Sequence, residues 1–394
     1  MLRVFLLGGA GLVGQSVAER FAKDAAITEI TIAGRNSEKA KQAASVIGEK
    51  ANSTRADATD EKHIARLVAD YDIFVNTSGP DYVVQPPAVR AAIRAGVHYC
   101  DVSCDGPAAE KVLKLSAKAE AAGMTAIIGI GWTPGLDNLM MTHAAHQLDE
   151  TEVVQTCLVW PMTNLVKGDP TKVAEELRKS GPFSASWETG MRCFSGQCKI
   201  YRDGKWVIVD PFENGVDLPD PYGGYVRAYP ACGAEPITLP RYVSGVRGVS
   251  VLLSFRPFQL NELARQLAVR IKSGEMSTKE AAISFIETAG ADRERWLSSS
   301  ENVSEEWPFW IVAHGMKDGS RVRYTMNASP EWLSTGGPLY TAAMMLLNGK
   351  IKGHGILPPE ACLDPIPFME DVASNVPGRP RGKKLFDESF EELV

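Results

Sequence analysis

The sequence predicts an α/β fold, a doubly wound parallel sheet of Rossmann type into which an α+β domain is inserted. Three observations support this prediction. Short apolar runs of strand length alternate with helical segments over residues 1–136. A glycine-rich turn joins the first strand to the first helix. Over residues 137–333 the pattern changes to alternating runs that are typical of an antiparallel or mixed sheet.

The first strand, residues 3–7, runs into a glycine turn and then into a helix at residues 15–23. Gly9, Gly11 and Gly14 fit the pattern G-x-G-x-x-G. The first glycine permits a tight turn, the second lets the backbone approach a pyrophosphate, and the third lets the helix pack closely on the strand. The N–H groups that open the helix add positive potential. Dinucleotide binding is therefore predicted for the whole turn: Gly9, Ala10, Gly11, Leu12, Val13 and Gly14.

The residues after the second strand, 27–33, indicate the form of the cofactor. They are Gly34, Arg35 and Asn36. This position faces the adenosine ribose in a Rossmann unit, where an acid binds the 2′-hydroxyl of NAD and an arginine pairs with the 2′-phosphate of NADP. No acidic residue stands beside Arg35. We therefore expect NADP, while NAD remains possible if Arg35 stacks on the adenine or points into solvent.

The third and fourth strands, predicted at residues 52–56 and 73–76, each end in polar residues. Asp57 either accepts a hydrogen bond from the adenine amino group or is a turn carboxylate. Small residues after the fourth strand leave room for the ribose and nicotinamide. We expect the following residues to contact the cofactor there: Asn76, Thr77, Ser78, Gly79 and Pro80.

Two further strands are predicted at residues 98–103 and 125–130, with helices at 87–95 and 107–122. The carboxyl ends of parallel strands meet at one edge of the sheet, so the fourth, fifth and sixth strands should converge near the nicotinamide. The types of side chain at that edge identify candidate site residues. Asp101 either handles a proton or binds an amine, or it caps a neighbouring loop.

Other polar and aromatic residues are candidates for the substrate. Alternation places Ser103 on the same face as Asp101 if the strand continues that far. Tyr82 and Trp132 either line the substrate pocket or pack in the core. An amino-acid substrate needs a cation for its carboxylate, and Arg247 of the inserted domain either supplies one or lies in solvent.

The inserted domain is predicted from its runs of strand and helix type. We expect strands at 153–160, 193–201, 206–209 and 250–255, a hairpin of 310–316 with 321–327, and helices at 138–148, 170–179, 260–272 and 277–289. Residues 334–394 are expected to return to the Rossmann domain, beginning with a helix that ends at Asn348.

Composition excludes several classes of partner. The net charge is −6, and the one basic run, residues 379–384, lies among prolines and glycines, so no nucleic-acid partner is expected. No apolar run is long enough to span a membrane. The seven cysteines form no C-x-x-C pair, which favours free thiols in the cytoplasm. His143 and His146 share a helix face without a third ligand, so no metal is expected.

Several motifs together resemble the saccharopine dehydrogenase-like oxidoreductases. They are Gly-Gly-Ala-Gly-Leu-Val-Gly at 8–14, Ala-Gly-Arg at 33–35, Asn-Thr-Ser-Gly-Pro at 76–80, Gly-Val-His-Tyr-Cys-Asp at 96–101, Gly-x-x-Pro-Gly-Leu-Asp at 131–137, Glu-Pro-Ile-Thr-Leu-Pro at 235–240, and residues 349–360. The set covers nearly the whole chain and is far more specific than the glycine motif alone.

The resemblance implies a discontinuous Rossmann domain around a substrate and dimerisation domain, and hence a homodimer. It also implies NAD(P)-dependent chemistry at a carbon–nitrogen bond of an amino acid or amine. The family often has an acid before Pro134-Gly135, whereas this chain has Thr133. Asp101 and Asp137 remain as the candidate catalytic carboxylates near the site.

Two other functions remain open from the sequence. The first is a redox sensor that binds NADP(H) without chemistry, which Thr133 favours and the large second domain disfavours. The second is a dehydrogenase for a plain carbonyl. The absence of a Tyr-x-x-x-Lys motif from residues 1–136 disfavours that alternative.

Overall fold

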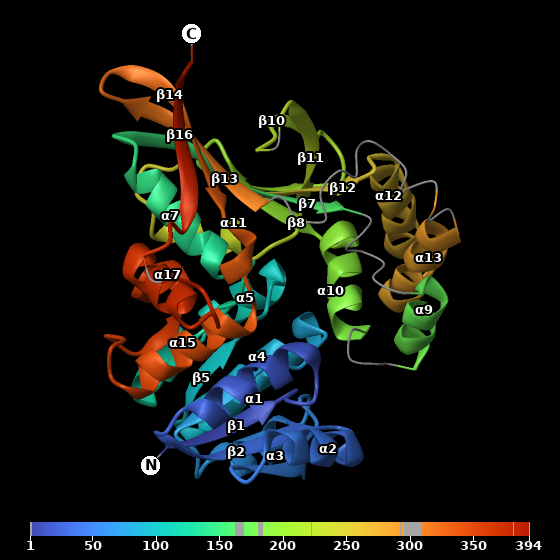
Figure 1. Cartoon of the computed structure of the whole chain (residues 1–394), viewed down its shortest axis with the longest axis vertical. Coiled ribbons are helices and arrows are strands. Elements are labelled where there is room, and N and C mark those ends of the chain that lie inside the picture. Colours follow the sequence, from blue (N-terminus) through green and yellow to red (C-terminus); the bar gives the residue numbers. More distant parts are fainter. Residues whose placement is uncertain are drawn as a thin grey trace. The chain divides into compact units, whose positions relative to one another are not determined.

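A computed structural model describes residues 2–161, 169–179, 184–221, 223–291, 294, 309–380 and 382–393. Arg381 of the basic run therefore lies outside the described residues. The chain divides into two compact units, residues 1–139 with 332–383 and residues 140–331 with 384–394. Each unit is described by itself below, with elements labelled as in Figure 1.

The first unit is built on a parallel sheet of Rossmann type. Its described strands are β1 (Leu2–Leu7), β2 (Ile27–Gly34), β3 (Ala51–Arg55), β4 (Ile73–Asn76), β5 (His98–Asp101), β6 (Thr125–Ile127) and β15 (Gly355–Leu357). They are ordered β15-β6-β5-β4-β1-β2-β3, and every neighbouring pair is parallel. The strand order reverses at β1, which places the glycine turn at the switch point where such sheets bind ligands. The predicted fold class is confirmed.

Helices form two connected groups around this sheet. They are α1 (Leu12–Lys23), α2 (Ser37–Ile47), α3 (Glu61–Val68), α4 (Asp81–Ala95), α5 (Gly106–Leu113), α6 (Ser116–Ala121), α15 (Gly336–Leu347) and α17 (Pro365–Ser374). One group consists of α1 with α2, α15 and α17; the other contains α3, α4 and α5. Figure 1 shows the orange α15 beside the blue α1. Tyr340 of α15 makes the contact, with its ring 5.3 Å from that of Phe21 and its hydroxyl donating to Asp24 at 2.8 Å.

The C-terminal part of the chain also adds a strand to the first sheet, which the sequence analysis missed. β15 pairs with β6, and the Thr125 hydroxyl donates to the carbonyl of Gly353 at 2.8 Å. Three residues are too few to show an alternating pattern, so β15 left no local signal. The short helix α16 (Pro359–Cys362) follows β15.

Several predicted elements of the first unit have different bounds in the structure. α4 begins at Asp81, six residues before its predicted start, and contains Pro86 and Pro87. Each proline removes an N–H donor, but the first turn is held because Val84 N–H donates to the carbonyl of Pro80 at 3.2 Å. The predicted helix at 107–122 is broken into α5 and α6, where Ser116 Oγ accepts from Ile356 N–H of β15 at 3.0 Å. β5 and β6 end earlier than predicted, at Asp101 and Ile127.

The second unit contains a mixed sheet. Its described strands are β7 (Glu150–Pro161), β8 (Cys198–Arg202), β9 (Lys205–Val209), β10 (Val216–Pro219), β11 (Tyr225–Ala231), β12 (Gly248–Arg256), β13 (Phe309–Lys317), β14 (Ser320–Ala328) and β16 (Phe386–Glu392). The order is β10-β11-β12-β7-β13-β14-β16, with β8 attached to β12 and β9 attached to β8. Among the described strands of this second sheet, only β7 and β12 pair in parallel. The predicted β13–β14 hairpin is confirmed.

Helices of the second unit are α9 (Pro170–Arg178), α10 (Ser184–Ser195), α11 (Glu235–Thr238), α12 (Gln259–Lys272) and α13 (Thr278–Ala291), and α7 (Leu136–His146) leads into the unit. The strand predicted at 193–201 is wrong over its first part, because α10 continues to Ser195. There Cys193 packs against Cys198 and Cys232. The end of the chain also departs from the predicted return to the Rossmann domain. β16 pairs with β14 and so completes the second sheet.

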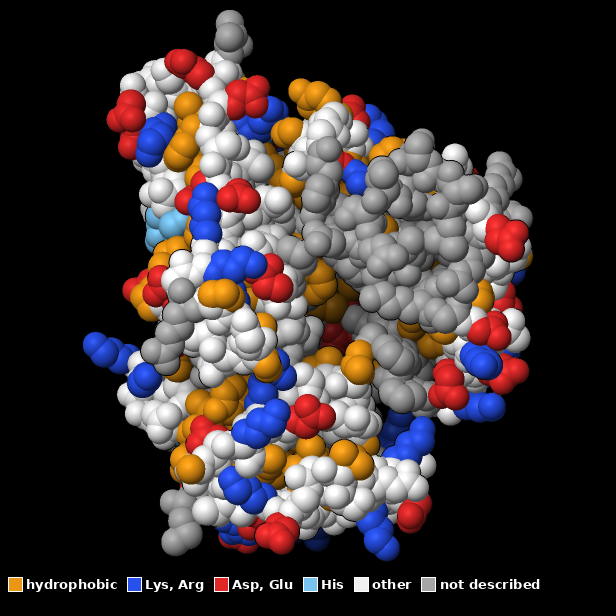
Figure 2. All heavy atoms as spheres, viewed as in Figure 1, with side chains coloured by type: hydrophobic (Ala, Val, Ile, Leu, Met, Phe, Trp, Pro, Cys, Tyr) orange, Lys and Arg blue, Asp and Glu red, His pale blue; other side chains and the backbone are white. Residues whose placement is uncertain are grey.

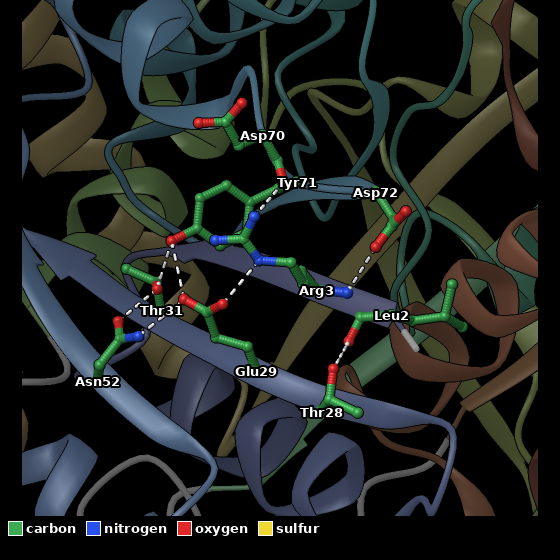
Figure 3. Close-up of polar contacts among 9 residues, drawn as sticks. All are labelled: Leu2, Arg3, Thr28, Glu29, Thr31, Asn52, Asp70, Tyr71 and Asp72. Atoms are coloured by element: carbon green, nitrogen blue, oxygen red, sulfur yellow. Dashed lines mark hydrogen bonds and ion pairs between the residues drawn. The ribbon is translucent and has the colours of Figure 1, made fainter.

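A polar cluster lies where the strands of the first sheet begin, shown in Figure 3. The Arg3 guanidinium donates to Glu29 at 2.7 Å and to the Asp70 carbonyl at 2.8 Å. Asn52 donates to the other Glu29 oxygen at 2.9 Å. These donors, with that of Arg3 the strongest, lower the pKa of Glu29. The cluster joins β1, β2, β3 and the chain before β4 at the amino edge of the sheet.

No helix among the described residues is long and apolar enough to cross a membrane. Figure 2 shows acidic and basic side chains interspersed over the face that it displays.

Candidate active site

The glycine turn after β1 is packed against both α1 and the end of β4. Gly8, with φ of +80°, adopts the left-handed conformation, so the tight turn belongs to Gly8 rather than to Gly9 as expected. A Cβ on Gly8 would lie 2.5 Å from the backbone nitrogen of Ser78. A Cβ on Gly14 would lie 2.4 Å from the carbonyl oxygen of Gly8. Side chains at these two positions would therefore push the turn away from the helix and from β4.

The start of α1 has the features of an anion site. Gly11 caps the helix without a side-chain hydrogen bond, and the first turn contains no acidic residue. Within the described part of the chain, no backbone carbonyl accepts a hydrogen bond from the N–H groups of Leu12, Val13 and Gly14. These N–H groups and the helix dipole favour a phosphate group. The residues present therefore fit the pyrophosphate of a dinucleotide.

A chain of hydrogen bonds joins the ends of β4 and β5. Asn76 Oδ1 accepts from the backbone N–H of Ser78 at 3.0 Å and from its hydroxyl at 2.5 Å. The amide of Asn76 donates to the Tyr99 hydroxyl at 3.1 Å, which in turn donates to Asp101 at 2.9 Å. Thr77 is held by two hydrogen bonds to the carbonyl of Leu7, one from its N–H and one from its hydroxyl. The segment predicted to contact the nicotinamide is thus fixed to both neighbouring strands.

Asp101 lies at the end of this chain and is fully buried. Its Oδ1 accepts from the backbone N–H groups of Gly129 at 2.8 Å and Ser103 at 3.1 Å. Its Oδ2 accepts from Tyr99 and, at 3.0 Å, from Gln85. Burial is the largest influence and raises the pKa of Asp101, while these hydrogen bonds oppose the shift. The geometry favours the second of the two roles expected for Asp101, that of a carboxylate that caps neighbouring loops.

Asp81, the first residue of α4, makes a similar connection that the sequence analysis missed. Its Oδ2 accepts from the backbone N–H groups of Cys104 at 2.7 Å and Asp105 at 3.2 Å. Asp105 in turn caps α5 by accepting from Ala108 N–H at 2.8 Å. Asp81 could have been found as an acid one residue after Pro80, at the start of a helix. The loops after β4 and β5 are therefore joined by two buried carboxylates.

The loop after β6 is closed by the C-terminal segment. Asn138 accepts from Gly135 N–H at 3.0 Å and donates to Glu360 of α16 at 3.0 Å. A Cβ on Gly131 would lie 3.0 Å from the side chain of Thr335, just before α15. Asp137, the second predicted catalytic carboxylate, is fully buried and accepts from Asn138 N–H at 2.8 Å. Glu360 is a further residue that the sequence analysis did not assign to this edge.

At the end predicted to bind the adenosine, β2 closes with Gly34, one residue later than predicted, and Arg35 and Asn36 follow it. A Cβ on Gly34 would meet nothing within 4 Å, so the backbone there is open. Asn36 caps α2 by accepting from Lys39 N–H at 3.0 Å. Asp57 accepts from the N–H and hydroxyl of Thr59, and these two bonds lower the pKa of Asp57 more than the nearby Arg35 does.

The remaining predicted residues are distributed over both units. Tyr82 is the second residue of α4, Ser103 is buried beside Asp101, and Trp132 is half-buried in the loop after β6. Arg247 belongs to the second unit, where its side chain is exposed. The structure thus brings the first three to the carboxyl edge of the Rossmann sheet, and their substrate contacts stay predictions. No group of His, Cys, Asp and Glu within the described ranges is arranged to hold a metal ion.

Comparisons with known proteins agree with this arrangement. Residues 4–127 match the saccharopine dehydrogenase NADP binding domain. The chain is 23% identical to carboxyaminopropylagmatine dehydrogenase of Synechocystis over 94% of both proteins. It is 24% identical to carboxynorspermidine synthase of Vibrio alginolyticus, over 93% of this chain and 94% of that protein.

Saccharopine dehydrogenase (NADP+, L-glutamate-forming) of Saccharomyces cerevisiae is 32% identical over 37% of this chain and 30% of that protein. The apo structure of the L-glutamate-forming yeast saccharopine dehydrogenase has the same fold, with a TM-score of 0.62, 18% identity, and coverage of 99% of this chain and all of that one. The matched domain, the full-length relatives and the shared fold agree with the motifs. Residues 4–127 therefore match the NADP binding domain of saccharopine dehydrogenases, and the whole chain is similar to saccharopine dehydrogenase-like NAD(P)-dependent oxidoreductases.

Proposed function

We propose that the chain is an NADP-dependent oxidoreductase that forms or cleaves a carbon–nitrogen bond. It reduces an imine made from an amine and a carbonyl, or oxidises the corresponding secondary amine, and its substrate is derived from an amino acid. The names of the full-length relatives, a carboxyaminopropylagmatine dehydrogenase and carboxynorspermidine synthases, support this substrate class.

The observation that carries the proposal is the combination of an α1 that has no side-chain cap with an arginine after β2. The first turn of α1 offers backbone N–H groups to a pyrophosphate, and Gly14 keeps that turn close to the helix. Arg35 stands where the 2′-substituent of the adenosine ribose is expected. When bound, NADP would supply or accept the hydride.

The chain's own residues then position the reactants. The hydrogen bonds from Asn76 to Ser78 hold the loop after β4 in one place. We assign Asp101 a positioning role, because its four hydrogen bonds join α4 and β5 to the chain after β5 and β6. Asp137 stays a candidate for proton transfer. Substrate binding by Tyr82, Ser103, Trp132 and Arg247 likewise stays a prediction.

The enzyme activity is tested by incubating the protein with NADPH and a panel of 2-oxo acids and aldehydes, each paired with a panel of amines. We expect NADPH oxidation only when both an amine and a carbonyl are present, because neither alone forms an imine. A secondary amine product identified by mass spectrometry would establish the bond formed. Oxidation by a carbonyl alone would favour a plain carbonyl dehydrogenase instead.

The choice of NADP is tested by Arg35→Asp. The substitution removes the expected partner of the 2′-phosphate and adds a like charge. A charged hydrogen bond contributes about 1.5–3 kcal/mol, so NADPH affinity should fall about 10- to 100-fold, while NADH affinity changes little. Nucleotide fluorescence titration measures both affinities. Equal affinities for NADPH and NADH before and after the substitution would remove the NADP assignment.

A second candidate function is a redox sensor that binds NADP(H) without catalysis. Two observations favour it: Thr133 stands where the family often has an acid, and both oxygens of Asp101 are engaged within the protein. The same panel separates the two functions. NADPH binding without oxidation by any pair of amine and carbonyl would support the sensor.

A further inference from the structure

The ends of β2 and β3 place two arginines at one corner of the Rossmann sheet. Gly34, the last residue of β2, is the register partner of Arg55, the last residue of β3. The two strand ends are joined by a hydrogen bond from Ala56 N–H to the carbonyl of Gly34 at 3.0 Å. Arg35 follows Gly34 directly, so Arg35 and Arg55 leave neighbouring strands at the same edge.

The charges at this corner do not balance within the protein. Both guanidinium groups act on the carboxylate of Asp57, the acidic group that they share. That carboxylate is already held by Thr59, through its N–H at 2.9 Å and its hydroxyl at 2.7 Å. Within the described residues, the side chain of neither arginine forms a hydrogen bond or an ion pair, and both residues are exposed. By contrast, Arg90 on the same unit forms an ion pair with Glu61.

The corner also has room for a ligand and the charge to hold a doubly charged one. A Cβ on Gly34 would meet nothing within 4 Å, so the backbone between the two arginines is open. A phosphate monoester carries about −1.5 to −2 charges near neutral pH. One arginine compensates about half of that charge and two compensate nearly all of it. The 2′-hydroxyl of NAD offers no such charge, so it leaves the two guanidinium groups unpaired.

We infer that Arg55, together with Arg35, binds the 2′-phosphate of the adenosine ribose and sets the preference of the site for 2′-phosphorylated nucleotides. The inference rests on the proposed function only in taking this edge of the sheet as a dinucleotide site. It adds a phosphate-binding residue from β3, whereas the Rossmann pattern indicates only the position after β2. Each arginine should contribute separately to the affinity for the 2′-phosphate, because the two side chains reach it from the ends of different strands.

The experiment compares 2′,5′-ADP with 5′-ADP by isothermal titration calorimetry, so its readout does not depend on catalysis. The unaltered protein should bind 2′,5′-ADP more tightly. Arg55→Ala should weaken 2′,5′-ADP about 10- to 100-fold and leave 5′-ADP within about twofold, as expected for a charged hydrogen bond to phosphate. Arg55→Lys should restore part of the loss, because it keeps the charge without the planar fork.

Arg66→Ala is the matched control. Arg66 is exposed in the last turn of α3, which runs back from the carboxyl edge of the sheet, so the variant loses the same charge away from the corner. It should leave both affinities unchanged. An unchanged preference in Arg55→Ala, with a reduced preference in Arg35→Ala, would overturn the role of Arg55 and leave the proposed oxidoreductase intact. If the unaltered protein bound neither nucleotide, the inference and the proposed function would both fall.

Discussion

Replacing Asp101 with alanine should destabilise the Rossmann unit strongly, because four buried donors lose their acceptor. Two of these donors, the backbone N–H groups of Ser103 and Gly129, cannot turn toward another acceptor. Each buried donor left unsatisfied costs about 1–3 kcal/mol, so the pair should cost about 2–6 kcal/mol in the free energy of unfolding. Removing a buried charge returns part of this cost, which is consistent with the raised pKa of Asp101.

Asp101→Asn should be much milder. The amide oxygen can keep both backbone hydrogen bonds, while the new NH₂ group faces Tyr99 and Gln85. Gln85 can turn its Oε1 toward that group, since this buried oxygen has no hydrogen-bond partner within the described residues. We expect a loss of about 1–2 kcal/mol, the size of one or two ordinary hydrogen bonds.

Urea unfolding, followed by circular dichroism, measures both stabilities, and NADPH turnover is measured in parallel. If Asp101 is a positioning residue, Asp101→Asn keeps turnover within a few-fold and the NADPH affinity unchanged. A loss of about 100-fold or more in turnover, with the fold intact, would instead indicate proton transfer by Asp101. The structural argument would be refuted if Asp101→Ala lost less than about 1 kcal/mol, or if asparagine cost as much as alanine.

Three further predictions concern the first unit. Gly14→Ala should cost about 1–3 kcal/mol and weaken NADPH binding, because its Cβ would lie 2.4 Å from the carbonyl of Gly8; thermal unfolding and nucleotide titration measure the two effects. Glu29→Gln should make the stability less sensitive to acid. The pKa of Glu29 is lowered in the folded protein, so its ionised form adds stability above pH 4.5, its ordinary pKa, and this stability is lost as the pH falls below that value. Urea unfolding midpoints measured across pH would show the difference. Tyr340→Phe should cost about 0.5–1.5 kcal/mol in urea unfolding, since it removes the hydrogen bond to Asp24.

Each prediction has a control elsewhere on the chain. Gly190→Ala, within α10, would place its Cβ 3.9 Å from Trp160 and should be neutral or stabilising. Glu49→Gln removes an exposed glutamate and should leave the pH dependence unchanged. Tyr225→Phe, at a side chain that is 69% exposed, should not alter stability. Equal effects in a variant and its control would contradict the corresponding argument.

Residues close together in the sequence carried most of the fold prediction. The glycine turn, the strands from β1 to β4 and the β13–β14 hairpin depend on patterns within one or two elements, so their types could be predicted locally. The motifs also indicated the family and the cofactor class before any contact was known. They could not show how each side chain is used. The sequence left two roles open for Asp101, handling a proton or an amine and capping a loop, and its four hydrogen-bond donors favour the second.

Contacts between distant residues decided the rest. The strand β15 exists because Gly355–Leu357 completes the sheet beside β6, although three residues carry no periodic signal. α4 begins before Pro86 because the first-turn contacts at Pro80 and the bonds from Asp81 to the loop after β5 outweigh the prolines' poor helix propensity. Arg55 acquires its proposed role only when β3 pairs with β2. The sequence by itself determined the elements and the chemistry offered at the glycine turn. The tertiary structure decided which polar groups meet, because a hydrogen bond depends on distances between atoms that the order of residues does not encode locally.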